Sequence, residues 1–240
     1  MIVIMPMAGR GSRFSNNGYQ TPKPLIPVDG IPMFVRALGS LGNLDYELLV
    51  IIALKEHEVE YKVSELISKH LSAKPVKLIL IDEVTDGQLC TVLLASKDFD
   101  KKPVLIMASD TLVEGNLEVD ITNLIDAKGI ISVINLKGDA WSFARTNNDG
   151  FVVEVQEKVR ISDWASTGLY FFSAGNDLIH FGNEMIKNNE RIRGEFFVIP
   201  VYQKLINSGL QIRISEAKAM WDMGTPDSLN NYIKHLKNGA

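Results

Sequence analysis

The chain alternates between two patterns of hydrophobic residues. Short runs rich in Ile, Val and Leu are separated by stretches in which apolar residues recur at the spacing of a helix. The short runs predict strands at residues 2–6, 48–53, 77–81, 103–108 and 130–136. The helical spacing predicts helices at residues 33–41, 56–71, 88–97 and 120–128. Such alternation is typical of an α/β fold, with a mostly parallel sheet flanked by helices on both faces.

The pattern changes after residue 136. Runs at residues 142–146 and 151–157 flank the sequence Asn147-Asn148-Asp149-Gly150, which predicts a β-hairpin. The remaining elements that the pattern predicts are a strand at 166–173, helices at 176–188 and 196–207, a strand at 211–214 and a helix at 226–236. Since neither a linker nor a repeat interrupts the sequence, we predict one domain over residues 1–240 with a mixed sheet.

The composition is that of an ordinary globular protein, with 46% apolar and 22% charged residues. The single cysteine, Cys90, excludes an internal disulfide, and the four histidines lack zinc-site spacing. The longest apolar run, residues 48–54, is far shorter than the roughly 20 residues that a membrane-spanning helix needs. The N-terminus has no secretory-signal pattern. We therefore expect a cytoplasmic protein without a membrane span.

The net charge of −4 gives the chain no general attraction to nucleic acids. Any bound phosphates would have to be held by local cations, against the overall charge. The sequence therefore favours a small phosphorylated ligand over a nucleic acid as partner. A homo-oligomer is compatible with the sequence, which does not reveal the oligomeric state.

The first predicted strand runs into a loop that contains glycines and cations. The loop begins Ala8-Gly9-Arg10-Gly11-Ser12-Arg13, and Lys23 follows in the sequence Thr21-Pro22-Lys23-Pro24. Glycines let backbone N–H groups approach an anion closely, and Arg13 and Lys23 add positive charge. The loop is not a Walker A sequence, and many glycine loops are only tight turns. It is a candidate triphosphate site.

Two aspartates are candidate metal ligands. Asp110 follows the strand predicted at 103–108, at the edge where open α/β sheets bind ligands, and Asp222 precedes the last helix. Either aspartate alone is better explained as a helix cap or turn residue. Together with phosphate oxygens and water, however, two carboxylates are the usual ligands of Mg²⁺. The pair therefore predicts a magnesium site.

These motifs resemble those of the sugar nucleotidylyltransferase (nucleotide-sugar pyrophosphorylase) family, and the resemblance covers nearly the whole chain. The matching segments, in the order that the family has them, are residues 8–13 with 22–25, 86–87, 109–110, 157–158, 166–171, 194–196 and 221–226. The resemblance implies a Rossmann-like nucleotidyltransferase fold. Its nucleotide-binding half would comprise residues 1–115 approximately, and a small C-terminal subregion within residues 116–240 would bind the acceptor.

The resemblance also implies roles for single residues. Those that would bind the nucleoside triphosphate are Ala8, Gly9, Gly11, Ser12, Arg13, Lys23, Gly87 and Asp110. Asp110 and Asp222 would bind Mg²⁺ and, with Arg13 and Lys23, would form the catalytic set. Those that would bind the acceptor are Glu157, Lys158, Thr167, Gly168 and Glu195, and we add Trp141, which stands where many family members have a glycine.

The implied reaction transfers a nucleoside monophosphate from a nucleoside triphosphate to a sugar 1-phosphate and releases pyrophosphate. Its product would be a nucleotide sugar of the kind used in polysaccharide biosynthesis. The second pKa of a phosphate monoester is about 6, so the attacking oxygen is already ionised at neutral pH and needs no general base. This agrees with the lack of a histidine in the matching segments.

Two departures from the family pattern leave the base and the acceptor open. Members that use uridine or thymidine nucleotides often have a glutamine shortly before the glycine matching Gly87, where this chain has Asp82 and Glu83. A carboxylate would suit the amino group of cytosine better than a uracil carbonyl. Trp141 could stack on a sugar face, or Trp141 or Trp164 could bind the cation of a phosphorylated amino alcohol; that both are simply core residues explains them nearly as well.

Three alternatives to a sugar nucleotidylyltransferase follow. The first is a cytidylyltransferase for a non-sugar acceptor similar to phosphocholine. The second, of a different class, is a non-catalytic nucleotide-binding subunit, against which the second metal carboxylate counts. The third is a glycosyltransferase of related fold, which would normally show Asp-x-Asp, whereas the residues two positions before and after Asp110 here are Ala108 and Leu112.

Overall fold

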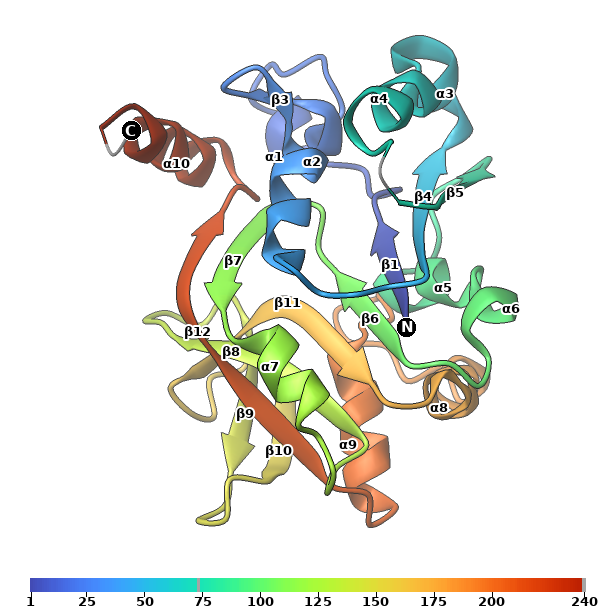
Figure 1. Ribbon diagram of the computed structural model, residues 1–240, viewed down its shortest axis with the longest axis vertical. Helices are drawn as coiled ribbons and strands as arrows, with labels where there is room; N and C mark the ends of the chain where they lie inside the picture. Colours follow the sequence, from blue (N-terminus) through green and yellow to red (C-terminus); the bar gives the residue numbers. More distant parts are fainter. Residues whose placement is uncertain (73, 239–240) are drawn as a thin grey trace.

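The computed structural model describes residues 1–72 and 74–238. Within them a 10-stranded sheet forms the centre of the molecule (Figure 1). Its main path, in spatial order, is β5 (Val76–Ile81), β4 (Leu48–Leu54), β1 (Ile2–Pro6), β6 (Val104–Met107), β11 (Trp164–Phe172), β8 (Gly129–Asn135), β12 (Ile212–Asp222) and β7 (Thr111–Gly115). β9 (Ser142–Thr146) pairs with β11 and with β10 (Val152–Glu157), which forms the predicted hairpin.

The α/β class and the mixed sheet are confirmed. β5, β4, β1 and β6 run parallel to one another, and β8 runs parallel to β12. β11 runs antiparallel to both β6 and β8, and β12 runs antiparallel to β7. The parallel strands follow the alternating first half of the sequence, because each parallel neighbour needs a crossover connection.

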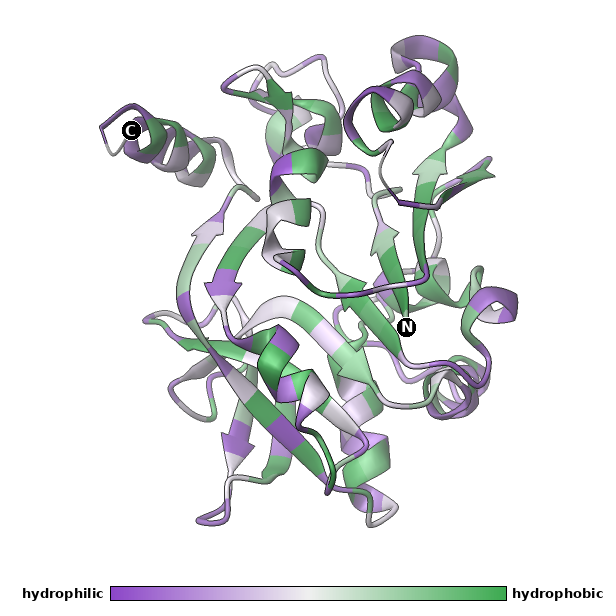
Figure 2. Cartoon of the chain, in the orientation of Figure 1, coloured by the Kyte–Doolittle hydropathy of each residue, from purple (hydrophilic) through white to green (hydrophobic). Residues whose placement is uncertain are grey.

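Helices cover both faces of the sheet. Ile2 and Ile4 of β1 point to one face, under α5 (Gln88–Leu93), α8 (Gly175–Lys187) and α9 (Ile199–Asn207). Val3 and Met5 point to the other face, under α2 (Met33–Leu38) and α4 (Val63–His70). All four β1 side chains are fully buried, which explains the unbroken apolar run. In Figure 2 the central strands are hydrophobic and the helices are hydrophilic on their outer sides.

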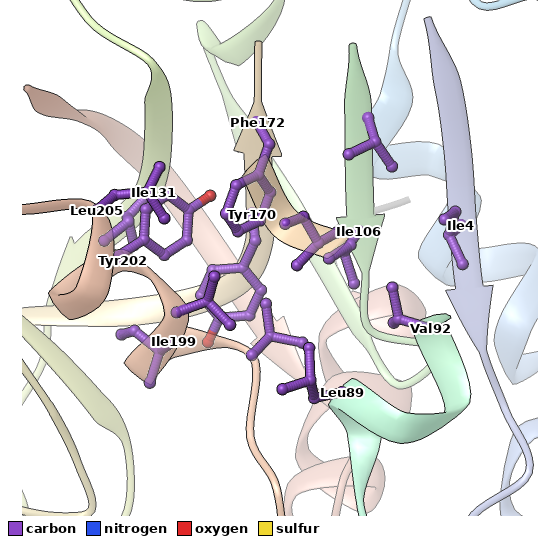
Figure 3. Close-up of a cluster of buried hydrophobic side chains, with 14 of the residues drawn as sticks. Ile4, Leu89, Val92, Ile106, Ile131, Tyr170, Phe172, Ile199, Tyr202 and Leu205 are labelled. Atoms are coloured by element: carbon purple, nitrogen blue, oxygen red, sulfur yellow. The ribbon is translucent and has the colours of Figure 1, made fainter. Parts of the chain in front are cut away.

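One core cluster fixes α9 to the sheet (Figure 3). The Tyr202 hydroxyl donates to the carbonyl oxygens of Phe171 at 2.8 Å and Ile130 at 3.2 Å, and its ring stacks on Phe172 at 4.4 Å. A buried hydroxyl needs such partners. α9 begins at Ile199 rather than at the predicted residue 196, because Phe196 pairs through its backbone with the chain before α5.

A smaller cluster joins the glycine loop to the C-terminal helix, α10 (Pro226–Asn238). Phe14 of α1 (Ser12–Ser15) is buried there with Met223 and Tyr232. Val28 of β2 (Pro27–Val28) also belongs to the cluster. β2 pairs with β3 (Ile31–Pro32), and η1 (Lys23–Leu25) precedes both strands. The loop after β1 and the segment after Asp222 therefore rest on the same apolar residues.

Several predicted bounds were wrong. The helix predicted at 56–71 is two helices, α3 (Lys55–Tyr61) and α4, because Lys62 between them has a left-handed φ of 54°. The helix predicted at 88–97 divides into α5 and α6 (Ser96–Phe99), and the helix predicted at 120–128 is α7 (Leu117–Thr122). The helix predicted at 33–41 ends as a 3-10 turn, η2 (Gly39–Leu41).

The largest difference is in β12, which continues beyond the predicted residue 214 to Asp222 and pairs with β7, a strand that was not predicted. Exposed Glu216 and Lys218 interrupt its apolar pattern, because only one side of this part of the strand is buried. Within the described residues, none of the helices is long and apolar enough to span a membrane.

Candidate active site

A cavity of about 490 Å³ lies at the carboxyl end of β1, where open α/β sheets bind ligands. This volume is within the usual range for a small-molecule site. Three segments line it: the glycine loop after β1, the turn before α5 and the loop before α9. Their lining residues are Pro6, Ala8, Gly9, Arg10, Gly11, Ser12, Val84, Thr85, Asp86, Gly87, Gln88, Thr91, Gly194 and Glu195.

The structure brings most of the predicted triphosphate residues to this cavity. Ala8, Gly9, Gly11 and Ser12 line it directly. Gly11 has a φ of 60°, and a Cβ at this position would lie only 3.1 Å from the Cβ of Lys23. A glycine therefore lets the loop pack against Lys23. Of the predicted set, Arg13, Lys23 and Asp110 are outside the cavity lining in the described chain, and Arg13 is exposed on α1.

Lys23 and Asp110 form an ion pair beside the glycine loop. Lys23 Nζ lies 2.6 Å from Oδ2 of Asp110, with the side chains 25% and 19% exposed. Burial alone would raise the pKa of Asp110, but the Lys23 ammonium and a hydrogen bond from Thr111 hold that pKa below its ordinary value. Asp110 is therefore ionised at neutral pH.

Asp222 lies next to Asp110, although the two are far apart in the sequence. Asp222 is the last residue of β12 and is opposite Thr111 of β7. A Cβ on Gly224 would lie 2.9 Å from Oδ1 of Asp222 and 3.1 Å from Oδ2 of Asp110, so both carboxylates face one point. Burial raises the pKa of Asp222, and the negative charge of Asp110 acts in the same direction.

This pair of carboxylates fits a divalent cation. Two converging carboxylates supply hard oxygen ligands and repel one another, which a shared cation relieves. In residues 1–72 and 74–238, no group of three or more His, Cys, Asp and Glu side chains could hold a metal by itself. An ion bound here would therefore complete its coordination with water and phosphate oxygens, as Mg²⁺ commonly does.

The turn before α5 forms the wall opposite the glycine loop. Gly87 has a φ of 136°, and a Cβ there would lie 2.5 Å from both the N and the O of Phe196. The Thr85 hydroxyl donates to the Gly87 carbonyl at 2.9 Å and lies 2.6 Å from the Thr91 hydroxyl, which stabilises the turn. Only glycine fits at residue 87.

Asp82 and Glu83 do not support the suggested preference for cytidine. Asp82 is bound to Lys55 at 2.6 Å and its side chain is 77% exposed. Both residues lie outside the cavity lining that the structure describes, whereas the polar side chains of Thr85, Asp86 and Gln88 belong to it. The carboxylates of Asp82 and Glu83 therefore give no reason to favour cytosine over uracil.

Three of the predicted acceptor residues are neighbours, and one of them lines the cavity. Glu157, only 6% exposed, accepts a hydrogen bond from the Ser142 hydroxyl, and Lys158 Nζ is 3.8 Å from its Oε1. Burial raises the pKa of Glu157, and the charges of Lys158, Arg193 and Glu195 act on it as well. Glu195 itself lines the cavity. These charged groups are therefore neighbours.

The other predicted acceptor residues make backbone or packing contacts. Thr167 is 2% exposed and its hydroxyl donates to the Ser132 carbonyl at 3.4 Å. Gly168, with a φ of 85°, lets β11 approach Ala108 just before Asp110. The Trp141 carbonyl accepts a hydrogen bond from the Lys158 amide at 2.9 Å. Contact of these three residues with an acceptor stays a prediction.

Sequence reasoning missed Arg191. Its guanidinium lies 2.8 Å from Oδ2 of Asp86, and Asp86 lines the cavity. Arg191 stands in the polar stretch Asn188-Asn189-Glu190-Arg191, which reads as a solvated loop. No spacing rule connects it with Asp86, so only the fold reveals the contact.

Several known proteins are similar to the chain. The model of the family described as "Nucleotidyl transferase" matches residues 2–239. The chain is 25% identical to UTP–glucose-1-phosphate uridylyltransferase AglF of Haloferax volcanii, over 99% of the chain and 97% of that protein. It is 24% identical to the bifunctional protein GlmU of Methanococcus aeolicus, where it spans 99% of its own length but only 56% of GlmU.

A solved structure is also similar. The nucleoside-diphosphate-sugar pyrophosphorylase from Vibrio cholerae superposes with a TM-score of 0.82 at 27% identity, covering 98% of this chain and 100% of that one.

Proposed function

Because the chain belongs to the nucleotidyl transferase family, we propose that it joins a nucleoside triphosphate to a sugar 1-phosphate, giving a nucleotide sugar and pyrophosphate. Similarity to a uridylyltransferase that acts on glucose 1-phosphate supports this acceptor class. We propose Mg²⁺ as the cofactor and the cytoplasm as the location. Residues 1–115 approximately would bind the nucleotide, and later residues would add the acceptor site.

The convergence of Lys23, Asp110 and Asp222 beside the glycine loop carries the proposal. A triphosphate and a phosphate monoester are both multiply charged anions, so their repulsion opposes the reaction. Gly9 and Gly11 line the cavity, where their backbone groups would bind phosphate oxygens, and Lys23 supplies a cation next to Gly11. A Mg²⁺ ion held by Asp110 and Asp222 would supply further positive charge to the phosphates.

The proposed reaction depends more on how the phosphate groups are oriented than on proton transfer. An oxygen of the acceptor phosphate attacks the α-phosphorus and forms a new P–O bond. The bond from the α-phosphorus to the bridging oxygen breaks, and its electron pair leaves with pyrophosphate. The acceptor oxygen is ionised at neutral pH, because its pKa is about 6, so the protein does not have to remove a proton. Alignment of three phosphate groups is the main task of the site.

The charged residues around Glu157 suit a sugar phosphate. Lys158 lies beside Glu157 and would bind the acceptor phosphate. Glu157 and Glu195 are hydrogen-bond acceptors that would receive the hydroxyl groups of a sugar. Gly194 and Glu195, from the second half of the chain, line the same cavity as the glycine loop, which supports transfer between two substrates bound side by side.

A pyrophosphate-release screen tests the proposal. Each of the four common ribonucleoside triphosphates and thymidine triphosphate is combined with hexose 1-phosphates, N-acetylhexosamine 1-phosphates, inositol phosphate and phosphocholine, with Mg²⁺ and with EDTA. We expect Mg²⁺-dependent release with one nucleotide and a sugar 1-phosphate. Release only with phosphocholine would replace the sugar acceptor by an amino alcohol. Nucleotide binding without release for any pair would identify a non-catalytic subunit.

A further inference from the structure

Two walls of the cavity are joined through their backbones. The amide of Phe196 donates to the Asp86 carbonyl at 2.9 Å, and the amide of Leu89 donates to the Phe196 carbonyl at 3.0 Å. Between these bonds lies Gly87, whose missing side chain leaves the room that Phe196 occupies. The turn at residues 84–88 and the loop at residues 189–195 therefore cannot move independently at this point.

Arg191 adds a second connection between the same two walls. Its guanidinium is 2.8 Å from Oδ2 of Asp86 and donates to the Gly194 carbonyl at 3.1 Å and to Asn189 Oδ1 at 2.7 Å. The guanidinium carbon also lies 4.3 Å from the centre of the Phe196 ring. The Arg191 side chain thus connects Asp86, in the turn at residues 84–88, with Gly194, which precedes Glu195.

The loop that Arg191 spans is costly to order. Asn189, Arg193 and Gly194 have φ values of 54°, 50° and 86°, and the first two are not glycines. Residues other than glycine rarely adopt such backbone angles, so the contacts around them must hold the conformation. The backbone bonds between Ile192 and Glu195, at 2.9 and 3.0 Å, close the turn that carries Glu195 into the cavity.

Stability does not account for the Asp86–Arg191 pair. The Asp86 side chain is 67% exposed and that of Arg191 is 30% exposed, and ion pairs of this kind contribute little to folding. A fork-shaped guanidinium instead fixes the relative orientation of the groups that it binds. The pair therefore fixes the turn that carries Asp86 relative to the loop that carries Glu195, where the two substrate sites meet.

We propose that Arg191 is a positioning residue, which together with Asp86 couples nucleotide binding to acceptor binding. The inference rests on the proposed function. A nucleotide bound against residues 84–88 would fix Asp86, and Arg191 would transmit this order to the loop that carries Glu195. The acceptor would then bind to an already ordered loop. By thermodynamic linkage, the acceptor must increase nucleotide affinity by the same factor.

Arg213 offers a matched control at the far end of β12 from Asp222. Its guanidinium carbon lies 4.1 Å from the centre of the Phe151 ring, and it binds the Asp126 carboxylate at 3.0 Å and the Asp149 carbonyl at 3.1 Å. The groups that it contacts, a carboxylate, a carbonyl and a ring, match those of Arg191. It is not part of the substrate cavity that the structure describes.

The test is an initial-rate grid for the nucleotide–sugar phosphate pair found in the screen. Both substrates are varied for wild type, Arg191→Ala, Asp86→Asn, Arg191→Lys and Arg213→Ala, and the grid gives the interaction factor between the substrates. Nucleotide binding to the free protein is measured by equilibrium titration with Mg²⁺–nucleotide.

We expect an interaction factor of about fivefold or more in wild type and Arg213→Ala. It should fall to about one in Arg191→Ala and in Asp86→Asn, and Arg191→Lys should restore it in part, since lysine keeps the charge but not the planar fork. Binding of the nucleotide alone to Arg191→Ala should change little.

The inference is overturned if wild type shows no interaction between the substrates, or if Arg191→Ala keeps the wild-type factor. It is also overturned if Arg191→Ala weakens the binding of both substrates equally and leaves the interaction factor between them unchanged, as general damage to the fold would. Absence of pyrophosphate release by wild type with every pair would overturn the proposed function instead, so the two failures are distinct.

Discussion

The backbone amide of Met223 donates a hydrogen bond to the carbonyl oxygen of Asp110 at 2.8 Å. This bond joins the end of β12 to the loop between β6 and β7, and it places the Asp222 carboxylate beside that of Asp110. Met223 itself is fully buried in the cluster that also holds Phe14 of the glycine loop. The apolar packing of α10 thus fixes the positions of the two carboxylates.

Replacement of Asp222 by asparagine should separate catalysis from stability. We expect pyrophosphate release to fall by a factor of about 100 or more, the size of effect seen when a preorganised electrostatic group is removed. Thermal unfolding should stay at the wild-type temperature or rise, because burial and the neighbouring Asp110 disfavour the ionised Asp222. Asn keeps the oxygen that accepts the Gly224 amide at 3.0 Å. Near-wild-type activity in Asp222→Asn would remove this residue from the site.

The cation at Lys23 should matter far more than other lysines in similar ion pairs. Lys23→Met should lower pyrophosphate release by a factor of about 100 to 1,000, since it removes positive charge next to the glycine loop. Lys102→Met is the control, because Lys102 also pairs with a carboxylate at 2.6 Å, that of Glu47, but on an exposed surface. The control should keep wild-type activity. Equal losses in the two variants would argue against a specific role for Lys23.

Gly87→Ala should damage both the fold and the nucleotide site. The new Cβ would lie 2.5 Å from backbone atoms of Phe196. The alanine would also have to adopt the φ of 136° that residue 87 has, which residues other than glycine avoid. We expect the free energy of unfolding to fall by at least about 3 kcal/mol. Gly18→Ala is the control, since Gly18 has a φ of 83° but no atom within 4 Å of the position that a new methyl group would take.

Gly18→Ala should cost only about 1–2 kcal/mol of strain. Urea denaturation and the Michaelis constant for the nucleotide measure the two effects. Equal destabilisation of the two variants would show that the backbone angle, and not contact with Phe196, is the reason for glycine at residue 87.

The ion pairs of Lys204 should make stability depend on pH. Lys204 Nζ lies 2.6 Å from Oε1 of Glu190 and 2.8 Å from Oε1 of Glu184. The hydrogen bond from Lys204 lowers the pKa of Glu190, and the hydrogen bonds to the two glutamates raise the pKa of Lys204. A lowered carboxyl pKa contributes stability above its unfolded value of about 4.3, and this contribution is lost as the pH falls through the folded pKa. A raised lysine pKa contributes below its unfolded value of about 10.4.

The difference in urea midpoint between wild type and Lys204→Met should therefore be present between about pH 4.3 and pH 10.4 and shrink on either side. It should be small, since both glutamates are more than a third exposed. A difference that stays constant down to pH 3 would instead point to packing of the lysine side chain as its cause.

Much of the fold follows from the sequence because its central strands are buried on both faces. β1 and β4 are unbroken apolar runs, and the structure has them where the pattern predicts. The closeness of Asp110 and Asp222 also follows from the sequence, since ligands of open α/β sheets bind at the carboxyl ends of strands and two carboxylates suit Mg²⁺. Their binding of Mg²⁺ stays a prediction.

Other features depend on tertiary contacts that a linear pattern does not contain. Lys62 interrupts a helix through its backbone angle, although lysine is a good helix former. The exposed half of β12 lacks an apolar pattern, so the strand that ends in Asp222 was not recognised as one. Asp82 was near Gly87 in the sequence but points to Lys55, whereas Arg191 is distant in the sequence and contacts Asp86.

A crystal structure with Mg²⁺ and the nucleoside triphosphate identified by the screen tests the central claim most directly. We predict the metal about 2.1 Å from an oxygen of both Asp110 and Asp222, with the phosphates against Gly9, Gly11 and Lys23. A triphosphate bound outside the cavity, or a metal that neither carboxylate contacts, would contradict the account.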